Sequence, residues 1–243
     1  MPRGSGIVML ADVLTYVLVP AVATVLGGIA AAFRAPGERL RSVLQHLAAG
    51  VVFAAVAGEL LPKVMHEGAP LPAILGFAAG VALMLGIKRL AEGGGPSPAG
   101  GQDGLVATIG VDIAIDGLLV GLSFSAGTKA GVLVTIALSL EVLFLALSAA
   151  AAQVAAGVSR GRVAVTAFGF AIVLVAAAAA GAVSLNSLSP LALEGVLSFG
   201  VAALLYLVTE ELLVKAHEVP ETPLTTATFF VGFLTILIIE MAI

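Results

Sequence analysis

Residues 130–153 read AGVLVTIALSLEVLFLALSAAAAQ, and Glu141 is the only charged residue among them. The hydrocarbon core of a bilayer is about 30 Å thick, so a helix of about 20 apolar residues can cross it. Seven other stretches have the same character, at 7–33, 42–62, 70–87, 104–126, 162–184, 190–214 and 223–243. The sequence therefore predicts an all-α polytopic membrane protein with eight transmembrane helices.

The composition of the chain supports this prediction. Of its 243 residues 60% are hydrophobic and only 11% are charged, with a mean hydropathy of +1.17. Soluble domains carry about 25% charged residues, so a soluble globular fold is excluded. The net charge of −4 does not favour a nucleic-acid binder, and the absence of cysteine excludes disulfides and thiolate metal sites. We expect one transmembrane transporter domain over residues 1–243.

Basic residues divide unequally between the two sides of the predicted membrane domain. One side carries eight in its loops, namely Arg34, Arg39, Arg41, Lys88, Arg89, Arg160, Arg162 and Lys215. The other side carries Arg3, Lys63 and Lys129. The positive-inside rule then predicts a protein of the plasma (inner) membrane with both termini outside the cytoplasm. The Gly/Pro-rich loop at about 92–103 is expected to be a flexible cytoplasmic connector.

A short motif occurs twice, as ELLPKVMHE at 59–67 and ELLVKAHE at 211–218. The copies lie in the second and seventh predicted spans, which cross the bilayer in opposite directions. Inverted repeats of this kind are typical of secondary transporters. They predict a 3+2+3 arrangement in which spans 1–3 and 6–8 are related and spans 4 and 5 lie at the centre. Chance similarity in a Leu-rich chain is the alternative.

Three carboxylates fall inside the two central spans. Asp112 and Asp116 are four residues apart and share one face of a helix, and Glu141 lies midway along the next span. A carboxylate at the bilayer centre costs about 2.5–3.5 kcal/mol on insertion scales. Neither span offers a Lys or Arg at that depth, since Lys129 lies in the turn between them. The acids therefore need protons or a bound cation, and protonated acids bonded to Ser and Thr between helices are the structural alternative.

The same region also predicts packing contacts. Gly117 and Gly121 are one turn apart beside the aspartates, a small-xxx-small pattern that lets a second helix approach closely. The sixth span has Thr166 as its only polar side chain over 163–183, so it should pack and not supply ligands.

Oxygen ligands favour hard divalent cations such as Mg²⁺ and Mn²⁺, whereas dedicated Zn²⁺ sites usually recruit His or Cys. All three histidines of the chain lie at or near span ends. Further pathway or entrance residues are expected near the two mouths, or close to the face of the aspartates. These candidates are Glu59, His66, Ser123, Glu210, Glu211 and His217. Those that are charged have an alternative role as solvated residues at the level of the lipid head groups.

With these residues in view, the chain resembles the ZIP (ZRT/IRT-like) family of divalent metal transporters. Residues 59–63 (ELLPK) and 210–218 (EELLVKAHE) look like the family's LLPE-type and EEL-type segments. Residues 112–121 (DIAIDGLLVG) are similar to its HNxPEGxxxG motif, with Asp112 at the His position and Asp116 at the Glu position.

The resemblance extends to the fifth span, where Glu141 matches the Glu of an HxxPE-type motif and Ala137 stands at the His position. It implies a metal site between spans 4 and 5, alternating access, uptake toward the cytoplasm and a homodimer. Without the motif histidines, the site would consist of carboxylates alone: Asp112, Asp116 and Glu141.

We therefore expect a secondary transporter of divalent cations, such as zinc, manganese, iron or cadmium, and not an enzyme. The cation is its substrate, and no cofactor is expected; the bilayer and a second copy are the expected partners. A proton-coupled transporter of another solute and a transport-inactive scaffold or metal sensor remain alternatives. An intramembrane aspartyl protease fits poorly, because Asp112 and Asp116 share one helix and no GxGD sequence is present.

Overall fold

The computed structural model describes residues 4–34, 36–67, 70–93, 102–184, 188–220 and 222–242. Within these ranges the regular structure is helical, without strands, and eight segments are long and apolar enough to cross a membrane. The predicted all-α membrane fold is confirmed. The segments are Leu10–Phe33, Glu38–His66, Pro70–Arg89, Gly104–Ala126, Thr128–Ala155, Arg160–Ser184, Pro190–Ala216 and Pro223–Ala242.

The connector expected at 92–103 is shorter than predicted at both of its ends. Helix α5 continues to Gly93 and helix α6 begins at Gln102, while residues 94–101 lie outside the described residues. An apolar helix can extend beyond the hydrocarbon region as long as its backbone hydrogen bonds remain intact.

Four spans consist of one α-helix each, and span 4 is a helix that ends in a 3₁₀ turn. The four are α5 (Pro70–Gly93), α7 (Thr128–Ala155), α8 (Arg160–Ser184) and α11 (Pro223–Ala242). In span 4, α6 (Gln102–Ser123) leads into the 3₁₀ turn η2 (Phe124–Ala126). Gly127 follows with φ of +118°, a conformation that other residues rarely adopt, so the chain can reverse directly into α7.

The other three spans are interrupted. Span 1 is divided into α1 (Gly4–Tyr16) and α2 (Leu18–Phe33), since Pro20 has no N–H to offer the Tyr16 carbonyl. Spans 2 and 7 each contain a π-helical segment. They are built from α3 (Glu38–Ala55), η1 (Val56–Leu60) and α4 (Leu61–Glu67), and from α9 (Pro190–Tyr206), η4 (Leu207–Leu212) and α10 (Leu213–Ala216).

The two π-helical segments lie in the repeated motif. Glu59 belongs to η1 and Glu211 to η4, so each copy of the motif places its first glutamate in a locally widened turn. Such segments are rare and often occur at functional sites, because they rotate side chains relative to a regular α-helix. The sequence similarity of the copies therefore extends to a shared and unusual backbone geometry.

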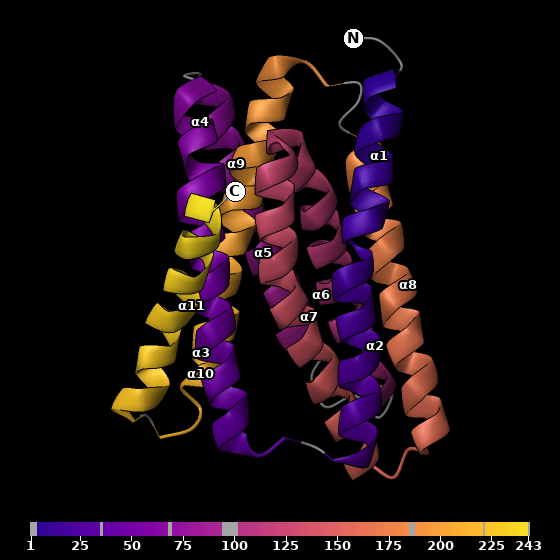
Figure 1. Cartoon of the computed structure of the whole chain (residues 1–243). Coiled ribbons are helices and arrows are strands. Elements are labelled where there is room, and N and C mark those ends of the chain that lie inside the picture. Colours follow the sequence, from indigo (N-terminus) through magenta and orange to yellow (C-terminus); the bar gives the residue numbers. More distant parts are fainter. Residues whose placement is uncertain are drawn as a thin grey trace.

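Helix packing follows the inverted repeat. If spans 1–3 are related to spans 6–8 and span 4 to span 5, the packing of α2 on α7 should recur as α8 on α6. The packing of α3 on α11 should recur as α9 on α5. These four pairs form the most extensive helix contacts in the described chain. The predicted 3+2+3 arrangement is confirmed, with α6 and α7 at the centre and the two termini toward the same end of the bundle (Figure 1).

Small residues allow the paired helices to approach closely, as predicted for span 4. A Cβ atom at Gly117 or Gly121 would collide with the carbonyl oxygens of Leu174 and Ala178 on α8. The hydrophobic effect does not drive helices together in lipid, because the lipid tails are as apolar as the side chains. Close packing contacts of this kind are therefore a main source of the stability of a membrane domain. The other pairs use glycines in the same way, at Gly27, Gly50, Gly76 and Gly232.

Candidate cation site

The three central carboxylates lie inside the helix bundle. Asp116 on α6 and Glu141 on α7 are each only 1% exposed, and Asp112 is half-buried. Asp116 Oδ2 and Glu141 Oε2 have no hydrogen-bond partner among the described residues. An unpartnered buried oxygen costs about 1–3 kcal/mol, and more when it is charged. Asp116 and Glu141 thus each lack a donating partner among the described residues, and of the two only Asp116 lines the cavity described next.

A small cavity, which we call the acidic chamber, lies beside Asp116. Its polar wall is formed by Asp112, Asp116 and Glu211, and the cavity measures about 10 Å³. That is room for about one particle of the size of a water molecule. The remaining wall is apolar and consists of Met84, Ile115, Leu119, Ala203 and Leu207, from α5, α6, α9 and η4.

A larger cavity of about 190 Å³, the vestibule, adjoins the acidic chamber. Asp112 and Glu211 line both cavities and therefore lie at the passage between them. The vestibule extends toward the end of the bundle that carries Lys88 and Lys215, and Thr108 and Glu210 also line it. Two cavities that share lining residues thus lie between this end of the bundle and Asp116, which is about halfway along span 4.

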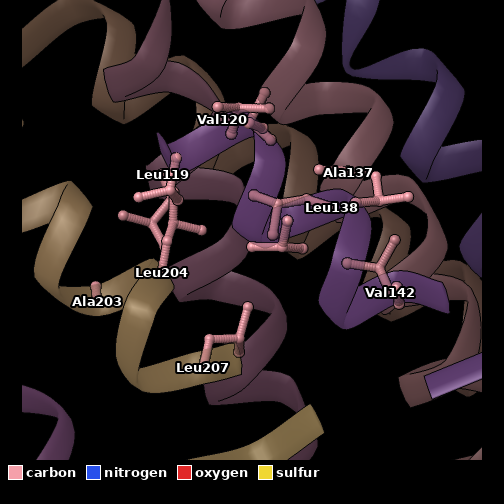
Figure 2. Packing of buried hydrophobic residues seen from close by; sticks show 14 of the residues in the cluster. Leu119, Val120, Ala137, Leu138, Val142, Ala203, Leu204 and Leu207 are labelled. Carbon is pink, nitrogen blue, oxygen red and sulfur yellow. The ribbon is translucent and has the colours of Figure 1, made fainter. Parts of the chain in front are cut away.

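Beyond Asp116 the route ends in apolar packing. Figure 2 shows Leu119 and Val120 of α6 packed with Leu204 of α9 and Leu138 of α7. All four side chains are buried in the main hydrophobic core. The vestibule therefore lies on one side of the acidic chamber, and packed apolar side chains lie on the other.

At the opposite end of the bundle, a buried glutamate is paired with two lysines. Glu59 is buried, and its carboxylate lies 3.3 Å from Lys129 Nζ and 4.0 Å from Lys63 Nζ. Lys63 also donates a hydrogen bond to the carbonyl of Ala126, at the end of span 4. These contacts join span 2 to the turn between spans 4 and 5. Glu59, predicted as a mouth residue, is thus held in ion pairs in this conformation.

The remaining pathway candidates lie away from the acidic chamber. His66 is exposed and bonds to the Pro62 carbonyl, while the His217 ring lies edge-on to His46 at 5.2 Å. Ser123 is buried and donates to the Val120 carbonyl of its own helix. Glu210 lines the vestibule and pairs with Lys88 at 3.0 Å. Of the six candidates, only Glu211 shares a cavity wall with both aspartates.

One residue of the site was not predicted from the sequence. Lys215 Nζ lies 3.6 Å from Glu211 Oε2, and Lys215 lines the vestibule together with Asp112. Lys129, at the start of span 5, pairs with Glu59, whereas span 7 brings Lys215 into the vestibule wall that Asp112 also lines. The i,i+4 spacing of Glu211 and Lys215 predicts their pairing, whereas their position beside span 4 depends on how the helices pack.

The described residues contain no group of three or more His, Cys, Asp or Glu side chains already placed to hold one metal ion. Carboxylates repel one another strongly in a water-poor interior, so bringing them together requires a cation. A single site made by Asp112, Asp116 and Glu141 stays a prediction.

Comparison with known proteins does not assign the chain to a family. The chain matches no family model, and no curated protein matches it. Its function must therefore be inferred from the arrangement of its own residues.

Proposed function

We propose that this protein is a secondary transporter of divalent cations, with the ion bound at Asp112, Asp116 and Glu141 between spans 4 and 5. One observation carries the proposal: two adjoining cavities that share Asp112 and Glu211 extend as far as Asp116, deep in a membrane-spanning bundle, where a buried carboxylate oxygen has no partner in the described chain. Intramembrane acids in such a setting mark ion or proton pathways.

The size and chemistry of the acidic chamber support a metal ion as the substrate. A cavity of about 10 Å³ fits one ion that has lost most of its water, whereas an organic solute needs hundreds of Å³. Its polar groups are oxygens, which suit Mn²⁺, Mg²⁺ and Fe²⁺. Zn²⁺ and Cd²⁺ remain candidates, since Zn²⁺ binds oxygen sites more tightly than Mn²⁺ does.

The inverted repeat supports alternating access. In transporters of this kind the related halves exchange roles, so that a path open at one end closes while its counterpart opens. The vestibule at the Lys215 end and the lysine contacts of Glu59 at the other end suit one of two such states. We place the Lys215 end in the cytoplasm, by the distribution of basic residues, and propose uptake across the plasma membrane by a homodimer. The resemblance to ZIP transporters points the same way.

Flux measurements in proteoliposomes test the proposal. Uptake of Mn²⁺, Fe²⁺, Zn²⁺, Cd²⁺ and Mg²⁺ by the wild-type protein is compared with uptake by Asp116→Asn and Glu141→Gln. We expect both variants to lose transport of the preferred ion, while Asp12→Asn, distant in sequence from the central acids, retains it. Undiminished flux in Asp116→Asn would contradict the site. Metal binding without any flux in the wild-type protein would favour a sensor or scaffold.

A further inference from the structure

Both halves of the repeat carry a glutamate in the π-helical segment and a lysine four residues later. Lys63 Nζ lies 4.0 Å from Glu59 Oε2, and Lys215 Nζ lies 3.6 Å from Glu211 Oε2. The two pairs lie toward opposite ends of the bundle, in spans 2 and 7, where the inverted repeat relates them. Each half therefore brings an ammonium group to the glutamate of its π-helical segment, and in the second half this glutamate, Glu211, also lines the acidic chamber.

Lys215 belongs to the wall of the vestibule and also lines a neighbouring cavity of about 120 Å³ beside Glu38 and Glu218. Its partner Glu211 reaches the acidic chamber itself. A lysine ammonium sits on a flexible stem of four carbons and can move by several ångströms without a change in the backbone. Lys215 can therefore approach the acidic chamber or withdraw from it along the vestibule.

The need for such a group follows from the charges around the acidic chamber. Asp112, Asp116 and Glu211 share the wall of the acidic chamber, and a fourth acid, Glu141, is buried on the neighbouring helix α7. When a divalent ion leaves, its charge has to be replaced before the emptied site can be enclosed in a water-poor interior. A proton or a second ion from solution would couple transport to that species. A positive charge attached to the protein would not.

We propose that Lys215 acts as a substitute cation that is part of the protein itself. When the transported ion leaves, the ammonium group of Lys215, held at Glu211, neutralises part of the negative charge of the acids. This inference rests on the proposed transport function. The empty transporter can then return to its starting state without binding another ion, so net uptake does not require exchange.

Two transport modes separate this role from a merely structural one. Net uptake into metal-free proteoliposomes requires the return of the empty transporter, whereas exchange of labelled external ion for the same ion inside does not. We expect Lys215→Met to slow net uptake by about tenfold or more and to leave exchange within about twofold, given the strength of short-range charge interactions. Lys215→Arg, which keeps the charge, should retain most net uptake. Arg89→Met is the control, because Arg89 also carries a positive charge near this end of the bundle but is exposed and lines neither cavity.

Metal affinity gives a second readout that does not depend on transport. The ammonium neutralises Glu211, which shares the chamber wall with Asp112 and Asp116, and it repels a cation bound there. Purified Lys215→Met should therefore bind Mn²⁺ more tightly than the wild-type protein. Equal losses of net uptake and exchange, no change in either, or an unchanged or weaker affinity would overturn the role of Lys215. A wild-type protein that moves no divalent ion in either mode would instead overturn the proposed function.

Discussion

Replacing Asp116 by asparagine should stabilise the protein and weaken metal binding at the same time. The two side chains have nearly the same shape, so packing is conserved and only the charge is removed. Asp116 is 1% exposed, and its Oδ2 atom has no partner among the described residues. The metal-free protein therefore bears a cost at this position that the variant avoids.

The size of both effects can be worked out from the position of the side chain. An aspartate at the bilayer centre costs about 2.5–3.5 kcal/mol. Asparagine has no charge but is still polar, so the substitution should remove about half of this cost. For a chain of this length, a gain of about 1–2 kcal/mol corresponds to a rise in melting temperature of about 3–6 °C. Loss of one carboxylate near the ion should cost about 3 kcal/mol, a decrease in affinity of about 10²-fold.

The assay is thermal unfolding in detergent, followed by circular dichroism with and without Mn²⁺. We expect Asp116→Asn to melt at a higher temperature than the wild-type protein without metal and to show little further rise when Mn²⁺ is added. Asp12→Asn should melt like the wild-type protein in both conditions. A variant that is less stable than the wild-type protein yet keeps its full response to Mn²⁺ would refute the reasoning, because Asp116 would then be a structural residue.

Two further predictions concern the packing and the closed end. Gly117→Val should lower the melting temperature by several degrees, because the new side chain would collide with the Leu174 carbonyl. Gly169→Val is the control and should not lower it, because the space around Gly169 is open. Equal stability of the two variants would contradict the close contact between α6 and α8. Lys129→Ala removes one of the two lysines paired with Glu59, so this end of the bundle should open more readily. A cysteine introduced by Ala57→Cys should then react faster with a membrane-impermeant maleimide. The chain has no native cysteine, so the introduced thiol is the only one that can be labelled. Unchanged labelling would mean that this ion pair does not keep the end closed.

Much of the fold follows from the sequence, because each membrane span is one continuous stretch of apolar residues and can be recognised without knowing its neighbours in space. Span 4 is predicted at 104–126 and found at Gly104–Ala126, and the other spans agree to within a few residues at each end. The inverted repeat was visible in a single short motif and extends through the packing of six outer helices on one another and on the central pair. Gly117 and Gly121 indicated a close helix contact correctly, although not that α8 would be the partner.

Other features could not be predicted in this way. The π-helical segments at Glu59 and Glu211 have no reliable signature in residue types, since they depend on how neighbouring helices pack around an extra residue in the turn. Glu211 was expected only at a mouth, and it lines the same cavity as Asp112 and Asp116. Lys215 was counted only as a loop charge, and it pairs with Glu211 beside the vestibule.

By itself, the sequence determined how many times the chain crosses the bilayer and which acids lie at mid-depth. Lipid offers backbone groups no hydrogen bonds, so every crossing must be a long apolar helix, and any charge within one stands out. Only the tertiary structure decided which of those charges meet. Whether two side chains share a cavity depends on the rotation and tilt of each helix against its neighbours, and these follow from contacts between residues far apart in the chain, such as Gly117 with Leu174.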